Sequence, residues 1–201
     1  MPGRRHTQRA KKGERRAQLL EHARQLIATK GYGAVAPQQI TEAAGTTPAV
    51  FARNFADMPD VAAGIVTEMH KRLIANASDR EGPSESLHDL NALVEQFQAE
   101  MKLPASPVHV VHLLLAEPAP DLRADLQTAF EPIAAGLAEQ IRAGQQEGVF
   151  RRTLDPQHAA WELLRALFGQ ALFRDIEPAA DRDNPQLTLD CLLHGLLKTD
   201  V

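Results

Sequence analysis

The segment AGTTPAVFARNF, residues 44–55, predicts a tight corner between two short helices. Gly45 closes one apolar helical run, since glycine is common just past a helix C-terminus. Thr47 followed by Pro48 is typical of a new helix start, because threonine is a favoured N-cap and proline fits the first helical position. Phe51 and Phe55 then lie one turn apart on one face. The pattern excludes one continuous helix through this region.

Helical periodicity also precedes and follows this corner. Apolar residues at 19, 20, 23, 26 and 27 predict a helix over about 14–30, which Gly31 and Gly33 end, and Pro37 begins a second short helix. Further helices are expected at about 57–77, 86–102, 107–116, 121–146, 156–174 and 185–198, with a polar linker at 79–86. No alternating run of strand length stands out, so the predicted fold class is all-α.

Charge is distributed unevenly along the 201 residues. Residues 1–60 hold ten Lys and Arg against five Asp and Glu, whereas residues 61–201 hold twelve against twenty-one. This asymmetry predicts a polyanion-binding N-terminal part on an acidic body. The predicted organisation is a flexible basic arm at 1–13, a helix-turn-helix domain at 14–57 and a larger helical domain at 58–201.

Several classes of protein are excluded or disfavoured. Cys191 is the only cysteine, so an intramolecular disulfide is impossible, and a reducing cytoplasm is the expected compartment. No apolar run approaches the roughly 20 residues that a membrane helix requires, so no membrane partner is expected. Nothing in the sequence indicates a cofactor.

Three helices within residues 14–55, the last two short and joined by a glycine corner, describe a helix-turn-helix. The small residues Ala43, Ala44 and Gly45 would let the two short helices approach closely, over a core formed by Leu20, Leu26, Ile27, Ile40, Phe51 and Phe55. The opposite face of the second short helix would remain free to enter a major groove of double-stranded DNA.

The chain here resembles the TetR family of one-component transcriptional regulators. The resemblance lies in Gly31-Tyr32 after the first helix, Ile40 and Ala43-Ala44-Gly45 in the second, and Phe55 at the end of the third. It implies a homodimer that binds a near-palindromic operator, and a small-molecule effector that shifts the helix at about 58–76 and weakens operator binding. It also implies that residues 58–201 form an effector-binding and dimerisation domain, and that the protein is a repressor rather than an enzyme.

The candidate DNA-binding residues lie on the two short helices, their corner and the basic arm: Gln38, Gln39, Thr46, Thr47, Pro48, Ala49, Val50, Arg53, Asn54, Arg4, Arg5, Lys11 and Lys12. The sequence departs from the family at three positions, where Ala52, Met58 and Ala36 replace a customary tyrosine, lysine and threonine. Either the basic arm replaces the lost backbone contacts, or DNA affinity is reduced.

The resemblance also places an effector cavity between the helices of the body. Candidate pocket residues are Phe97, Met101, His109, His112, Phe130 and Phe168. The last two helices are apolar over a wide face and would form the dimer interface, with candidates Trp161, Leu164, Phe168, Leu189, Leu192, Leu193 and Leu196. A monomeric core would show a similar pattern.

Two other functions stay open from the residues alone. His109 and His112 have metal-ligand spacing on a helix, which would suit an all-α metal-dependent enzyme, but no third ligand is evident nearby. The other alternative is a protein-interaction module whose helix-turn-helix no longer binds DNA, and Ala52 and Met58 favour it.

Overall fold

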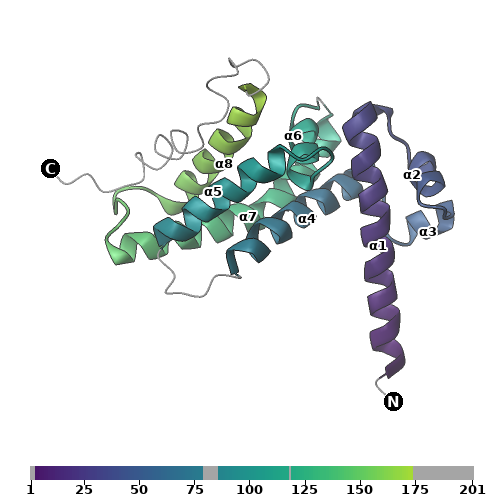
Figure 1. Ribbon diagram of the computed structural model, residues 1–201, viewed down its shortest axis with the longest axis horizontal. Helices are drawn as coiled ribbons and strands as arrows, with labels where there is room; N and C mark the ends of the chain where they lie inside the picture. Colours follow the sequence, from purple (N-terminus) through teal and green to yellow (C-terminus); the bar gives the residue numbers. More distant parts are fainter. Residues whose placement is uncertain (1–2, 79–85, 118, 174–201) are drawn as a thin grey trace. The chain divides into compact units, whose positions relative to one another are not determined.

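The computed structural model describes residues 3–78, 86–117 and 119–173 (Figure 1). Its regular elements in these ranges are helical, as predicted: α1 (Gly3–Lys30), the 3₁₀ turn η1 (Tyr32–Ala34), α2 (Pro37–Ala43), α3 (Pro48–Ala52), α4 (Met58–Ser78), α5 (Ser86–Met101), α6 (Pro107–Leu115), α7 (Pro120–Glu147) and α8 (Pro156–Phe173). The all-α fold class is therefore confirmed. The predicted helix at 185–198 lies outside the described residues.

Contacts divide the described chain into two compact units. The first contains the residues up to Met69 together with 103–129, and the second contains 70–102 together with the described residues from 130 onward. Helices α4 and α7 each contribute residues to both units. The predicted boundary at 57/58 differs from this division because α6 packs against α1, which joins α6 to the N-terminal helices.

The first unit has a core formed by one face of α1 and the short helices that follow it. Leu19, Ala23 and Ile27 of α1 are fully buried, as is Ile40 of α2, and Phe51 and Phe55 complete the group. Ala44 is buried as expected, but Ala43 is exposed and Leu26 is only half-buried. A single small residue at the end of α2 therefore suffices for the close approach of the two short helices.

Helix α1 begins at Gly3, so residues predicted as an irregular arm continue the first helix instead. Arg, Gln, Ala and Lys dominate this segment and are strong helix formers. The segment has no apolar periodicity in its sequence, so the pattern that identifies amphipathic helices did not reveal it.

The second unit has an aromatic centre. The Phe168 ring of α8 makes edge contacts with the rings of Phe97 and Phe130, at centroid distances of 5.0 and 5.7 Å. Glu147, the last residue of α7, accepts hydrogen bonds from the hydroxyl and the backbone N–H of Ser86 at 3.0 and 3.3 Å. The carboxylate therefore joins the end of α7 to the start of α5.

Helix α7 ends in a reversal that packs Phe150 back onto the helix. Gly148 has φ +80°, a conformation that favours glycine, and the backbone N–H groups of Val149 and Phe150 both donate to the carbonyl of Gly144. The Phe150 ring is buried against Gly144, where an added Cβ would lie 2.2 Å from a ring carbon. Within the described ranges, no helix is long and apolar enough to span a bilayer.

We predict that Gly144→Ala lowers the free energy of unfolding by about 1–3 kcal/mol, because the methyl group has to displace a buried ring. Gly136 of the same helix is the matched control, since a Cβ there meets nothing within 4 Å. Gly136→Ala should raise stability by about 0.5–1 kcal/mol through helix propensity alone. Urea unfolding followed by circular dichroism measures both changes, and equal shifts in the two variants would contradict the packing.

Candidate nucleic-acid interface

The corner between α2 and α3 is closed by backbone hydrogen bonds. Gly45 has φ +59°, and its N–H donates to the carbonyl of Glu42 at 3.1 Å. The N–H of Thr46 then donates to the carbonyl of Thr41 at 2.8 Å. The buried Thr41 hydroxyl donates to the carbonyl of Gln38 at 2.8 Å and so leaves no unsatisfied polar group inside the corner. These hydrogen bonds restrict the turn to one backbone conformation, which fixes the orientation of α3 against α2.

Two aromatic rings and one arginine hold the far end of α3. The rings of Phe51 and Phe55 pack with centroids 5.5 Å apart, and both are buried. The guanidinium of Arg16, on α1, lies 4.0 Å from the centre of the Phe55 ring and donates a hydrogen bond to the carbonyl of Asn54. Cation–π attraction and this hydrogen bond together attach the end of α3 to α1.

The same arginine reaches the start of α4. Nη2 of Arg16 lies 3.1 Å from Oδ1 of Asp60, whose Oδ2 accepts from the N–H of Ala56 at 3.0 Å. Oδ1 of Asp57 accepts from the N–H of Asp60 at 2.9 Å. Asp57 and Asp60 thus cap the start of α4, and Arg16 links that cap to α1.

This attachment leaves one face of α3 open. Among the predicted DNA-binding residues, Gln38, Thr47, Pro48, Ala49 and Arg53 are exposed, whereas Thr46 and Val50 are half-buried. Thr47 occupies the N-cap position, but its side chain makes no capping hydrogen bond. Five residues of the predicted set are therefore exposed to solvent in the described part of the chain.

Two predicted contacts are already engaged within the fold. The Gln39 side chain accepts a hydrogen bond from the N–H of Ala36 at 2.8 Å, whereas Ala36 itself, at the N-cap, makes no side-chain capping bond. The Asn54 amide donates to the carbonyl of Val50 at 2.8 Å. The side chains of Arg4, Arg5, Lys11 and Lys12 lie outside the described part of the chain.

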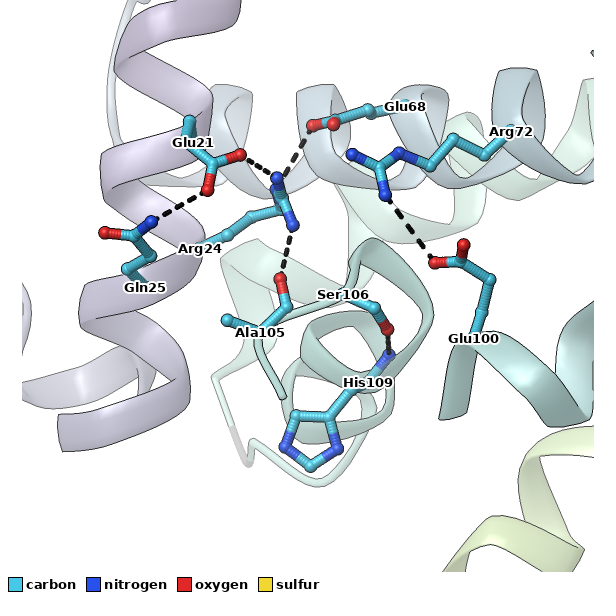
Figure 2. Close-up of polar contacts among 9 residues, drawn as sticks. All are labelled: Glu21, Arg24, Gln25, Glu68, Arg72, Glu100, Ala105, Ser106 and His109. Atoms are coloured by element: carbon cyan, nitrogen blue, oxygen red, sulfur yellow. Dashed lines mark hydrogen bonds and ion pairs between the residues drawn. The ribbon is translucent and has the colours of Figure 1, made fainter. Parts of the chain in front are cut away.

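A buried arginine joins three segments of the first unit (Figure 2). The side chain of Arg24, on α1, is only 4 % exposed, and it donates to the carbonyl of Ala105 and to the carboxylate of Glu21. Its Nε also lies 3.4 Å from a carboxylate oxygen of Glu68 on α4. Ala105 has φ +55°, a strained conformation for a residue with a Cβ, and it directly precedes Ser106, the N-cap of α6. Arg24 thus holds α1, α4 and the start of α6 together.

The residues predicted for an effector pocket fall into different units. Phe97, Met101, Phe130 and Phe168 belong to the second unit, where all four are buried. His109 and His112 lie on α6 in the first unit and are half-buried. Across the described ranges, no three His, Cys, Asp or Glu side chains are arranged to hold a metal ion.

The predicted dimer interface is described only in part. Leu164 and Phe168 are buried inside the second unit itself, and Trp161 is half-buried. Leu189, Leu192, Leu193 and Leu196 lie outside the described residues. For Phe168, packing within the chain accounts for the apolar pattern that also suggested an interface.

Residues 19–64 match the model of the bacterial regulatory proteins of the tetR family, and this range covers the helix-turn-helix and its attachment to α1 and α4. The helix-turn-helix segment belongs to the TetR family of transcriptional regulators. The family is one of regulatory proteins, which sets the enzyme alternative aside. No sequence among curated proteins matches the chain.

Solved structures share the fold of this regulator. A putative TetR-family regulator from Rhodococcus sp. superposes with a TM-score of 0.74 at 20% identity, covering 90% of this chain and 96% of that one. SmeT, the repressor of a Stenotrophomonas maltophilia multidrug efflux pump, gives 0.71 at 21% in its triclosan complex, covering 92% of both chains. A putative regulator from Saccharomonospora viridis in complex with choline gives 0.67 at 22%, covering 93% and 100%.

Arg16 and Arg24 were not identified as site residues from the sequence of the regulator. The position of Arg24 in the helical period was the one sequence feature that could have indicated its burial. Arg24 lies between Ala23 and Ile27, which are both fully buried, so the period places it beside the apolar face of α1. A charged residue in such a position requires a partner, but the partners lie up to 81 residues away in sequence. Spacing alone does not identify contacts of that length.

We predict that Arg24→Met lowers the free energy of unfolding by about 3–5 kcal/mol, because it leaves the carbonyl and carboxylate groups around it without their buried cation. Arg142→Met is the matched control, since Arg142 forms an exposed ion pair with Glu139 at 2.5 Å. Arg142→Met should change the free energy of unfolding by less than about 1 kcal/mol. Denaturant unfolding measures both, and a small effect at Arg24 would show that the three contacts are not made.

Tyr32, the only tyrosine, gives a spectroscopic test of the first unit. Its pKa is raised from 10.0 to about 12, first by burial and then by the nearby carboxylates of Asp57, Glu117 and Asp125. The folded state binds this proton more tightly than the unfolded state, so the associated stability is present below pH 10 and is lost as the pH rises through about 12.

A pH jump read by absorbance near 295 nm, before the chain unfolds, should therefore show phenol ionisation near pH 12 in the folded protein and near pH 10 in denaturant. Asp125→Asn should lower the folded midpoint by removing one nearby negative charge. A folded midpoint at the unfolded value would contradict the placement of Tyr32 beside these carboxylates.

Proposed function

We propose that this regulator is a ligand-responsive repressor that binds a near-palindromic operator as a homodimer. The observation that carries the proposal is the open face of α3, because Thr47 and Arg53 are exposed on a short helix that is fixed at both ends. A helix mounted in this way can enter the major groove and present its first residues to base edges.

Rigidity matters because base readout depends on placing donors within hydrogen-bond distance. The corner at Gly45 fixes the start of α3, and Arg16 and Phe55 fix its end. Little conformational entropy then remains to be lost when the helix docks, so the binding free energy is not spent on ordering it.

Ligand response is supported by the relatives and by the aromatic centre of the second unit. SmeT has been seen with triclosan and the Saccharomonospora viridis protein with choline. In this chain the rings of Phe97, Phe130 and Phe168 form an apolar cluster beside which an effector would bind. Helix α4 begins at Met58, directly after the helix-turn-helix, and continues to Ser78. A shift of its C-terminal half would therefore be transmitted to the helix-turn-helix.

An effector can act in this way only if it binds the DNA-free and DNA-bound conformations with different affinities. The homodimer supplies two helix-turn-helix domains, and the distance between them would have to match two operator half-sites about one helical turn apart. A change in that distance lowers operator affinity without any change in α3 itself.

The alternative, an interaction module that no longer binds DNA, is favoured by Ala52 and Met58. Ala52 is exposed on α3 and carries no hydrogen-bonding group, and Met58 begins α4 where the family has a lysine. Arg53 neighbours Ala52 and is exposed, so it can supply a phosphate contact from the adjacent position.

The direct test is selection of duplexes from a random-sequence library, followed by affinity measurements at several salt concentrations. A repressor should enrich a near-palindromic sequence and lose affinity steeply as salt rises, because phosphate contacts release counterions. Enrichment of no duplex would support the interaction module instead.

We predict that Arg53→Ala weakens binding to the selected duplex by about tenfold or more and leaves the unfolding curve unchanged. Arg123→Ala, at an exposed arginine of α7, is the matched control and should change neither. Gel retardation at fixed salt measures the two affinities, and equal binding by both variants would remove Arg53 from the interface.

A further inference from the structure

The open face of α3 is rich in methyl groups and poor in hydrogen-bonding groups. Pro48, Ala49 and Ala52 are exposed and apolar, and Val50 is half-buried beside them. Thr47 adds both a methyl and a hydroxyl group, and Arg53 provides the one charged side chain of the exposed set. This balance is unusual for a surface that reads bases, where bidentate amide and guanidinium groups carry most direct readout.

The fold engages two of the amide side chains that could have changed this balance, Asn54 and Gln39, and leaves Gln38 of α2 exposed. Asn54 would be able to make a bidentate contact with adenine, but its amide donates to the carbonyl of Val50 at 2.8 Å. Gln39 of α2 is likewise engaged, because its side chain accepts from the N–H of Ala36 at 2.8 Å. Releasing either group would break a contact that caps or closes a helix.

The major groove offers one apolar feature to such a surface, the C5-methyl group of thymine. We propose that α3 selects its half-site mainly by packing Thr47, Ala49 and Val50 against thymine methyl groups, with Arg53 fixing the register. This inference rests on the proposed function, because it names the chemistry by which the same interface chooses its DNA.

Helix geometry orders these contacts along the groove. Ala49 and Arg53 are four residues apart and therefore share a face, about 6 Å apart along the helix axis. Ala49 lies in the first turn of α3, which is the part that approaches base edges, and Arg53 follows at the C-cap, where it can reach a phosphate or a guanine. A thymine is thus expected opposite Ala49 in each half-site.

The test uses the full chain and the duplex enriched from the random library, with deoxyuridine replacing thymine one position at a time. This exchange removes only the methyl group and leaves base pairing and all groove donors and acceptors in place. Loss of a packed methyl should weaken binding about fourfold at each contacted position, a value set by the transfer free energy of one buried methylene. Deoxyuridine outside the half-sites should have no effect.

Ala49 is tested with two variants, since Ala49→Gly removes the methyl group but weakens the helix, whereas Ala49→Ser keeps a side chain of similar size. Ala49→Gly should bind the thymine and deoxyuridine duplexes equally at one position of each half-site, whereas Ala49→Ser, which keeps the Cβ, should retain sensitivity there, and the other positions should be unaffected in both. Sensitivity that persists unchanged in both variants overturns the assignment.

The outcomes separate this inference from the function on which it rests. If no duplex is enriched, the proposed function fails and this inference fails with it. If a duplex is enriched but binds equally well with deoxyuridine at every half-site position, the protein is a DNA-binding regulator that does not read thymine methyl groups, and the inference alone is overturned.

Discussion

The buried guanidinium of Arg24 is the interaction on which the first unit depends. One side chain on α1 satisfies the carbonyl of Ala105, pairs with Glu21 and lies beside Glu68, so α1, α4 and the segment before α6 share a single cation (Figure 2). The carbonyl that it binds belongs to a residue with φ +55°, and the hydrogen bond offsets the strain of that conformation. A charge buried in this way is costly unless all its partners are present, so the arrangement favours one geometry over near alternatives.

The helix-turn-helix depends on α1 in a second place. Arg16, on α1, contacts the end of α3 through Asn54 and Phe55 and the start of α4 through Asp60. Gly64 of α4 packs so closely that an added Cβ would lie 3.0 Å from a Leu20 methyl carbon, which keeps α4 against the same face of α1. The position of α3 is therefore set by residues outside its own open face. The open face can then vary in chemistry without loss of the scaffold.

Much of this could be predicted from sequence because its signals are local. The corner at Gly45, the helix start at Thr47-Pro48 and the end of α7 at Gly148 follow from backbone preferences of single residues. Engagement of Asn54 and Gln39 by backbone groups depends on rotamers within formed helices, and the contacts of Arg24 depend on segments far apart in the chain. The length of α1 was missed because its first residues, rich in Arg, Lys and Gln, carry no apolar period. The sequence pattern predicted the residues of α3, and the structure shows which of their side chains are exposed and which form hydrogen bonds within the fold.

The central claim is that the chain contacts DNA through the open face of α3, on a helix-turn-helix that keeps its internal geometry when it binds. Amide chemical-shift mapping during titration with the selected duplex tests it most directly, since it reports each residue separately. The account predicts the largest shifts at residues 46–53, with smaller ones in α2 and along α4, where a change between the DNA-free and DNA-bound conformations would pass. Shifts concentrated in the second unit, with residues 46–53 unaffected, would contradict it.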